Sequence, residues 1–457
     1  MSRMNQNIEN LRHTELALPQ GGKVVVLDPG ATLTAEMTAM LQALHSRSIG
    51  GINDHLRVLA ERGAAKFMSS YYVGYGHKSI GDCGTAIVFV EGISMLAAKA
   101  LQDSPLYNGQ ESSTRYIDYA AQPLLNPLGT AAGKDVLERW RTFYLQAVSE
   151  MKATLPTRHP RQPEEKETVY DKAITARAFD ICRGFLPAGA ATNVAWSTTL
   201  RQFADRILQL RHHPLAEVRD IATVLEGALL AAYPNSFNQE KKRYDKTEAY
   251  LAEAAKHYYF HDPNITAAKL VRDGVDHEGL AAYRGLLLSL PQKTELPKWL
   301  GAYGEVGLAF PLDFGSFRDL QRHRALNQRM PLLTAELGFA DWYLEELTPE
   351  LRTAALALLT EQKERVANLA TTPEIAQYYQ PMGYRVSNLL SGDLPALVYM
   401  LELRSASTVH PTLVKVVQEL GQLLIEQYAD LGLTLHLATD GGRFDVKRGL
   451  QDIVLQT

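Results

Sequence analysis

Gly84-Thr85-Ala86-Ile87-Val88-Phe89-Val90 is a β-rich run that leads into Leu101-Gln102-Asp103. A similar order recurs far downstream, where Gly304-Glu305-Val306-Gly307-Leu308-Ala309-Phe310 leads into Leu320-Gln321-Arg322. β-Branched and aromatic residues favour strands, and each run is followed by residues suited to a connector and a helix. Both stretches therefore predict strand, connector and helix, and their likeness predicts a domain that occurs twice in the chain.

A second pair of similar segments supports this interpretation. Leu208-Gln209-Leu210-Arg211 resembles Leu401-Glu402-Leu403-Arg404, and each is followed by apolar residues at the spacing of one buried helix face. These residues are Val218, Ile221, Ala222, Leu225 and Leu229 after the first segment, and Leu413, Val416, Val417, Leu420 and Leu424 after the second.

The chain has 457 residues, which is too long for one ordinary core and favours two domains of roughly 200 residues each. Helical spacing dominates 135–154, 200–210 and 349–370, while strand signals are few. We therefore expect an α+β fold, with two tandem copies of a small, mostly antiparallel sheet flanked by long helices. The expected ranges are a first domain at 1–245, a helical linker at 246–285 and a second domain at 286–457.

The composition excludes several classes of protein. Charged residues make up 21% of the chain and the formal charge is -4, which predicts neither a nucleic-acid nor a membrane partner. The two cysteines support no disulfide framework, and the polar amino terminus lacks the apolar core of a signal peptide, so we expect a cytoplasmic protein. No histidine and carboxylate grouping has the spacing of a metal site, and none of the common nucleophile motifs occurs.

Two charged segments stand out as candidate binding residues. Glu111-Ser112-Ser113-Thr114-Arg115-Tyr116 could simply cap a helix, but a hydroxyl, an arginine and backbone N–H groups at a turn also form a phosphate cradle. Arg322-His323-Arg324 is expected at the end of a helix that begins near Phe317, and taken alone it could be the solvated face of that helix.

Together these segments resemble the signature of the flavin-dependent thymidylate synthases, also called thymidylate synthase complementing proteins. In that family an R-H-R triplet stands about five residues before E-x-S-x-R-Y. Here the first copy has Asp103-Ser104-Pro105 in place of the triplet, and the second has 330–334 (Met-Pro-Leu-Leu-Thr) in place of E-x-S-x-R. Each copy has thus lost what the other keeps. The resemblance covers about 22–237 and, more weakly, about 290–435.

The resemblance implies a role for each matching residue. Glu111, Ser113 and Arg115 would hold the nucleotide, with Ser113 and Arg115 at its phosphate. Arg183, in Cys182-Arg183-Gly184-Phe185-Leu186-Pro187, and either Arg211 or Arg404 would face the nucleotide base, although an arginine such as Arg211 could also simply complement the end of a helix. The flavin would be held by Arg322, His323 and Arg324, and by His77 of the Gly76-His77-Lys78-Ser79 segment. The acid-histidine pair usual after that segment is Asp82-Cys83 here.

By the same resemblance, the chain would convert deoxyuridylate to thymidylate with flavin adenine dinucleotide as cofactor and methylenetetrahydrofolate and NADPH as co-substrates. No protein nucleophile is needed. Because ordinary members are homotetramers with shared active sites, we expect a homodimer that forms a pseudo-tetramer with composite sites. Two alternatives remain: related flavin chemistry on a modified pyrimidine acceptor, and a catalytically inactive protein that binds flavin or nucleotide.

Overall fold

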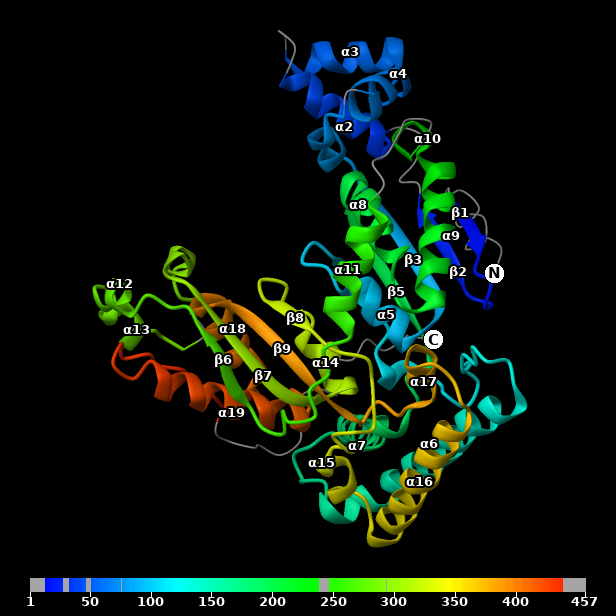
Figure 1. The fold of residues 1–457 in the computed structure, drawn as a ribbon, viewed down its shortest axis with the longest axis vertical. Helices are drawn as coiled ribbons and strands as arrows, with labels where there is room; N and C mark the ends of the chain where they lie inside the picture. Colours follow the sequence, from blue (N-terminus) through cyan, green and yellow to red (C-terminus); the bar gives the residue numbers. More distant parts are fainter. Residues whose placement is uncertain are drawn as a thin grey trace. The chain divides into compact units, whose positions relative to one another are not determined.

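The chain packs as two compact units, each built from two separate stretches of sequence (Figure 1). The first unit takes its residues from Met1–Ser112 and Ala191–Lys256, and the second from Ser113–Ala190 and His257–Thr457. These units differ from the contiguous ranges expected from the sequence, because the stretch 113–190 packs with the carboxyl-terminal half of the chain. The computed structural model describes residues 13–27, 33–46, 51–74, 76–237, 246–292 and 294–438.

The first unit is built on an antiparallel sheet with the strand order β1-β2-β3-β5-β4. Its strands are β1 (His13–Ala17), β2 (Lys23–Leu27), β3 (Thr85–Ser94), β4 (Asn108–Glu111) and β5 (Ala191–Thr199). In β3, Val88 and Val90 are fully buried while Ile87 is exposed and Phe89 is partly exposed, as expected of a strand with one face on the core. The strand predicted from 84–90 is therefore confirmed.

Three helices of the first unit accompany this sheet, of which two begin directly after a strand. They are α5 (Met95–Gln102), α8 (Leu200–Leu210) and α9 (Ala216–Ala232). Ser94 and Thr199 end their strands and cap α5 and α8 by accepting hydrogen bonds from backbone N–H groups. Helix α9 packs on β1 and β2, and all five apolar residues predicted for its inner face are buried. The unit also contains α2 (Ala35–His45), α3 (Ile52–Arg62), α4 (Ala65–Phe67), η1 (Met68–Gly74), η2 (Lys78–Cys83), α10 (Pro234–Phe237) and α11 (Thr247–Tyr258).

The second unit is built on another antiparallel sheet, with the strand order β6-β7-β9-β8. Its strands are β6 (Lys269–Asp273), β7 (Glu305–Asp313), β8 (Asn327–Arg329) and β9 (Arg385–Asp393). Helices α14 (Phe314–Leu320), α18 (Leu394–Arg404) and α19 (Pro411–Gln427) follow β7 and β9. The second predicted strand and helix are thus also present. Strand β6 lies inside the stretch 246–285 that was expected to be a helical linker, so the second sheet begins earlier than expected.

Long helices complete the second unit. Helix α6 (Ala131–Arg158) packs against both α7 (Glu167–Cys182) and α16 (Pro349–Asn368). They confirm the helices predicted at 135–154 and 349–370. The backbone segments around Gly189 and Tyr378 lie side by side, since Gly189 N donates to Tyr378 O at 2.9 Å and Ala188 N to Gln380 O at 2.8 Å. The remaining elements are η3 (Thr114–Tyr116), α6 (Ala131–Arg158), α7 (Glu167–Cys182), η4 (Arg183–Phe185), α12 (His277–Ala281), α13 (Arg284–Leu288), η5 (Lys298–Tyr303), α15 (Asp341–Glu345), α16 (Pro349–Asn368), α17 (Pro373–Ala376) and η6 (Gln377–Tyr379).

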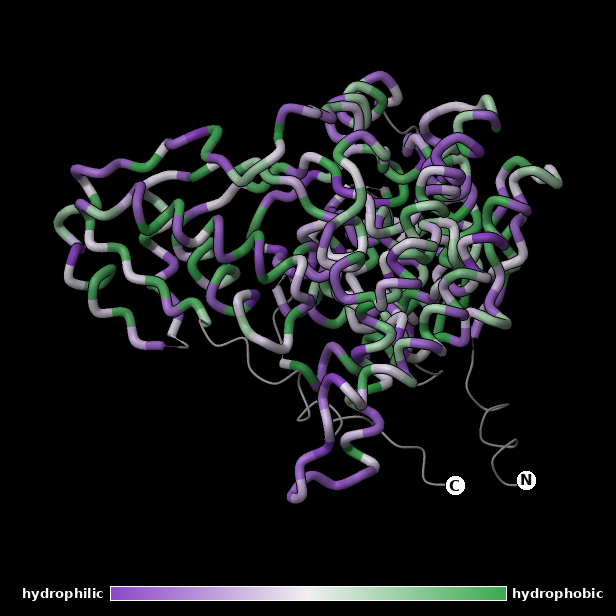
Figure 2. The backbone as a smooth tube through the Cα atoms, turned by 90° about the horizontal axis from the view of Figure 1, so that it is seen from below, coloured by the Kyte–Doolittle hydropathy of each residue, from purple (hydrophilic) through white to green (hydrophobic). Residues whose placement is uncertain are grey.

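The two sheets correspond to each other element by element. The order β2-β3-β5-β4 in one matches β6-β7-β9-β8 in the other, and α5, α8 and α9 stand in the chain as α14, α18 and α19 do. We call these two sets of elements the first and second sheet modules. Along the tube in Figure 2, hydrophobic and hydrophilic stretches alternate, as they must when helices and strands each bury one face. The expected α+β class, with small antiparallel sheets and helices, is confirmed.

Candidate functional site

Arg183 is a buried arginine at the centre of a polar network in the second unit. It lies in η4, directly after α7, and is only 8% exposed. Its Nη2 donates to Ser316 Oγ at 3.1 Å, and its Nη1 lies 3.8 Å from Asp319 Oδ2. Both partners belong to α14, the helix that precedes the Arg322-His323-Arg324 triplet. Arg183, from the Cys182–Pro187 segment, is therefore in contact with the helix that leads to the triplet.

Two carboxylates of different character accompany Arg183. Asp313 caps α14 by accepting from Ser316 N at 3.0 Å, and it also accepts from Tyr343 Oη at 2.9 Å. Burial raises the pKa of Asp313, although Arg183 opposes that change. Burial would also raise the pKa of Asp319, but the guanidinium of Arg183 and three further arginines outweigh it and hold that pKa below its usual value. The arginines therefore favour the ionised form of Asp319, whereas burial disfavours that of Asp313.

Arg115 joins the same network from η3. Its Nη2 lies 2.7 Å from both Oδ1 and Oδ2 of Asp180, and its Nε donates to Oδ1 at 3.1 Å, so the two groups form a two-pronged ion pair. Asp180 belongs to α7, one helical turn before Arg183. Its backbone oxygen lies 3.1 Å from Nε2 of His410, a buried residue that caps α19. Arg115 thus has an internal carboxylate in the position that a ligand phosphate was expected to take.

The triplet itself lies in the turn after α14, where its members differ in exposure. Arg322 is exposed and its Nη2 lies 3.5 Å from Asp319 Oδ1. His323 is buried, and its Nε2 accepts a hydrogen bond from Arg404 Nε at 2.6 Å. Burial and the nearby guanidiniums of Arg404 and Arg322 lower the pKa of His323 to about 3. Arg324 is exposed at the surface. His323 is consequently a neutral imidazole held in one orientation by an arginine.

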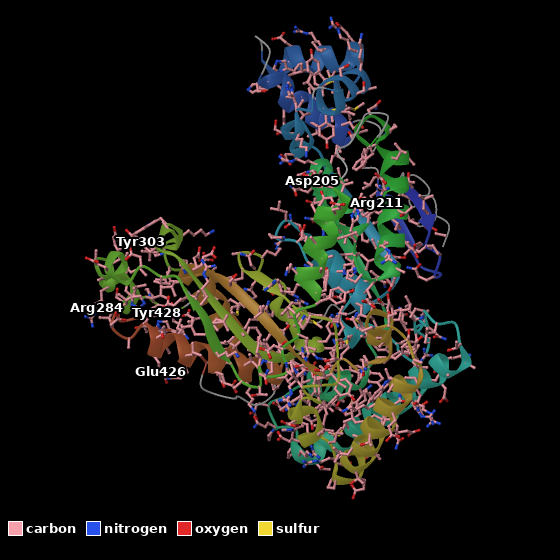
Figure 3. All side chains as sticks on the ribbon, in the orientation of Figure 1. Asp205, Arg211, Arg284, Tyr303, Glu426 and Tyr428 are labelled. Carbon is pink, nitrogen blue, oxygen red and sulfur yellow. The ribbon has the colours of Figure 1, made fainter. Side chains whose placement is uncertain are left out.

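The remaining residues predicted for the site lie elsewhere. Glu111 ends β4 in the first unit and accepts from Gln102 Nε2 at 2.8 Å. His77 is exposed and precedes η2. Arg211 follows α8 and forms an ion pair with Glu226 of α9 (Figure 3). Ser113 stands beside Arg115 and caps η3 by accepting from Arg115 N at 3.4 Å.

Five of the predicted residues therefore belong to one continuous set of contacts and electrostatic interactions in the second unit. They are Arg115, Arg183, Arg322, His323 and Arg404. The sequence analysis missed the residues that connect them. These are Asp180, Asp313, Ser316, Asp319, Tyr343, His410 and Thr412. Asp319 stands three positions before Arg322, a spacing that suits an ion pair on a helix, but no spacing indicates its contact with Arg183 or that of Asp180 with Arg115.

The charge balance of this cluster favours an anion. Arg183, Arg318, Arg322 and Arg404 all act on the single carboxylate of Asp319. The buried Nε of Arg183 has no hydrogen-bond partner among the described residues. Over those same ranges of the chain, no three or more His, Cys, Asp or Glu side chains are grouped so as to hold a metal ion. No helix in the described part has both the length and the apolar composition needed to cross a membrane.

Comparison with known proteins agrees with these features. A UPF0159 protein of Chlamydia muridarum is 25% identical over 423 residues, which covers 79% of this chain and 79% of that protein. One from Chlamydia pneumoniae is 26% identical over 406 residues, covering 76% of each chain. One from Thermoplasma acidophilum is 22% identical over 413 residues, covering 75% of this chain and 83% of that protein. The family model described as thymidylate synthase complementing protein matches residues 32–235. The family resemblance is thus confirmed over the stretch 32–235, which is similar to the thymidylate synthase complementing proteins.

Proposed function

We propose that this protein is a flavin-dependent enzyme that transfers a one-carbon unit to a uracil nucleotide. In its most specific form, the reaction converts deoxyuridylate to thymidylate, with methylenetetrahydrofolate as the carbon donor and NADPH as the reductant. One observation carries the proposal. Arg115, from the first part of the split motif, and Arg183 share one network of contacts and electrostatic interactions with Arg322 and His323 from the second part.

The residues present fit a flavin nucleotide. Four guanidiniums around one carboxylate leave a net positive charge, which suits the phosphates of such a cofactor. Arg322 is exposed and can reach a ligand, while the buried Arg183 adds positive charge behind it. When bound, the flavin would supply the reducing equivalents that convert the transferred carbon to a methyl group.

The chain's own residues would bind and orient the reactants. Arg322 would hold an anionic group at the surface of the cluster. Arg183, buried and fixed by Ser316 and Asp319, would keep a positive charge in a region of low polarity, where it stabilises developing negative charge more strongly than it could in water. Neutral His323 cannot give up a proton from Nε2, because that atom is already an acceptor for Arg404. Its role is therefore to fix Arg404 in place.

A second candidate follows from the Arg115–Asp180 ion pair. Because Asp180 engages the guanidinium of Arg115 on both oxygens, a nucleotide phosphate would have to displace a carboxylate to bind there. This arrangement favours either flavin chemistry on a different pyrimidine acceptor or a flavin-binding protein without methyl transfer. In either case Arg322 would still hold the flavin.

We further propose that the protein works in the cytoplasm as a homodimer whose four sheet modules stand in for the four subunits of ordinary family members. The correspondence of the two modules supports this assembly, since two chains then provide four equivalent sheets. Light scattering of the purified protein tests it directly, and a monomer at micromolar concentration would exclude it.

The function is tested on the purified protein in two steps. The absorption spectrum first reports bound flavin in the wild type, in Arg322→Ala and in Arg57→Ala, whose arginine is 72% exposed and pairs with Asp54 in the first unit. We expect Arg322→Ala to lose flavin and Arg57→Ala to keep it. Release of tritium from position 5 of deoxyuridylate, in the presence of both co-substrates, then reports the chemistry. Flavin binding without tritium release favours the second candidate, and a protein that ignores added flavin rules out both.

A further inference from the structure

Tyr399 is an exposed aromatic residue beside the arginine cluster. It lies on α18, five positions before Arg404, and is 44% exposed. Its ring meets that of His323 edge to face, with centroids 6.0 Å apart and planes at 62°. It also lies within electrostatic reach of Arg404. An accessible aromatic ring therefore lies next to the Arg322-His323-Arg324 triplet.

The neighbours of Tyr399 restrict the motion of its ring. His323 supports its ring from one side and is itself held by the 2.6 Å hydrogen bond from Arg404. Arg322 follows α14 and pairs with Asp319 of that helix, and its side chain is 59% exposed. An aromatic ring with restricted motion and a neighbouring exposed guanidinium can take a planar ligand that carries negative charge.

The first sheet module carries neither feature at the corresponding positions. The shared Leu-x-Leu-Arg segment places Arg206 where the second module has Tyr399, and Arg206 Nη2 donates to Ala100 O at 2.7 Å. Asp103 stands at the position of Arg322 and forms an ion pair with Lys99 at 2.5 Å, with both side chains buried. An arginine bonded to the protein backbone and an internal ion pair thus replace the aromatic and cationic surface.

We propose that Tyr399 stacks on the ring system of the flavin while Arg322 binds its phosphate, and that each chain carries one such site, in the second module. This inference rests on the proposed function and adds a residue that determines how the cofactor is held. Stacking of aromatic rings contributes about 0.5–1.5 kcal/mol beyond simple burial, which corresponds to roughly two- to tenfold in affinity. Together with the loss of buried area, removing the ring of Tyr399 should therefore weaken flavin binding about tenfold.

The test titrates flavin adenine dinucleotide into wild type, Tyr399→Ala, Tyr399→Phe and Trp299→Ala, and follows flavin fluorescence. Trp299, in η5, is 51% exposed and serves as the matched aromatic control. We expect Tyr399→Ala to bind about tenfold more weakly and its bound flavin to be brighter, because a stacked tyrosine quenches flavin emission. Tyr399→Phe and Trp299→Ala should match the wild type, and the wild type should bind one flavin per chain.

Each other outcome has a distinct meaning. If the wild type binds flavin but Tyr399→Ala has the same affinity and emission, the inference on Tyr399 is overturned while the proposed function stands. Two flavins per wild-type chain would overturn the assignment to one module. A wild type that binds no flavin overturns this inference and the proposed function together. Circular dichroism of each variant separates loss of binding from loss of folding.

Discussion

The buried histidine of the triplet makes the stability of the protein depend on pH in a predictable way. Burial, with Arg404 and Arg322 nearby, lowers the pKa of His323 from 6.5 to about 3. The unfolded chain takes up a proton at this position below about pH 6.5, whereas the folded chain takes it up only near pH 3. The contribution of His323 to stability is therefore complete above about pH 6.5 and is lost progressively as the pH falls toward 3.

The size of this loss follows from the two pKa values. At a pH about two units below 6.5, the unfolded state gains about 2–3 kcal/mol from protonation that the folded state does not share. His323→Gln removes the titration but keeps an acceptor oxygen for Arg404. Urea unfolding at about pH 7.5 and about pH 4.5 should thus show a free energy of unfolding that falls by about 2–3 kcal/mol less in His323→Gln than in the wild type.

The comparison needs a control for changes at other sites. His45→Gln replaces an exposed histidine of α2 and should follow the wild type at both pH values. If His323→Gln and the wild type lose the same stability on acidification, His323 is not buried as a neutral acceptor, and the Arg404 contact that organises the cluster is wrong.

Three further predictions concern the rest of the second unit. Arg183→Met should lower the free energy of unfolding, measured with urea, by about 3–5 kcal/mol, because it removes the cation that faces the buried carboxylate of Asp313 and leaves Ser316 without that donor. Asp430 and, less strongly, Asp273 raise the pKa of His277 by hydrogen bonding. The stabilisation that His277 gains from these contacts is therefore present below about pH 6.5 and is lost as the pH rises. Asp430→Asn should flatten the dependence of the melting temperature on pH between about pH 6 and 8, and an unchanged profile would contradict the contact. Gly304→Ala should lower the free energy of unfolding, measured by thermal denaturation, by about 1–3 kcal/mol. The backbone φ is +120° at this position, and a Cβ would lie 2.0 Å from Gly274 O. A melting temperature equal to that of the wild type would show that the turn has another conformation.

The elements that the sequence predicted correctly are those whose pattern is local. Alternation in 84–90 and the 3, 4, 7 spacing in α9 and α19 depend only on which face of an element is buried, and both are recovered in the structure. Strand β6 escaped prediction because four of its five residues are exposed, so its short sequence Lys269–Asp273 carries no alternation. It pairs with β7 along one edge of the sheet, and that pairing is visible only once the sheet has formed.

The site divides in the same way. Arg183 and Arg322 could be found because they belong to recognisable motifs, but the acids that hold them could not be assigned a role. Asp319 reads as an ordinary polar residue near the end of a helix, and its function depends on a guanidinium 136 positions earlier in the chain. His410 likewise looks like a simple helix cap. The side chain that neutralises or orients a charged residue is chosen by tertiary packing, which sequence spacing does not record.

A comparison of the two modules shows how such pairings persist while the residues change. Ser94 caps α5 in the first module, and its hydroxyl donates to Glu217 Oε2 at 2.6 Å, in the first turn of α9. In the second module the cap of α14 is Asp313, and the first turn of α19 supplies the hydroxyl of Thr412, which is hydrogen-bonded to it. The hydroxyl and the carboxylate have thus exchanged positions between the helix cap and the first turn of the facing helix. Each module still pairs one hydroxyl donor with one buried acid. Two buried carboxylates facing each other would repel, and an unpaired buried carboxylate would destabilise the fold. The exchange explains why the sequences of the two modules look so different at a shared structural position. In the second module the acid at the cap, Asp313, also accepts a hydrogen bond from Tyr343 and interacts with the charge of Arg183. Ser94, the corresponding cap in the first module, has no negative charge to offer an arginine, so this polar cluster is specific to the second module.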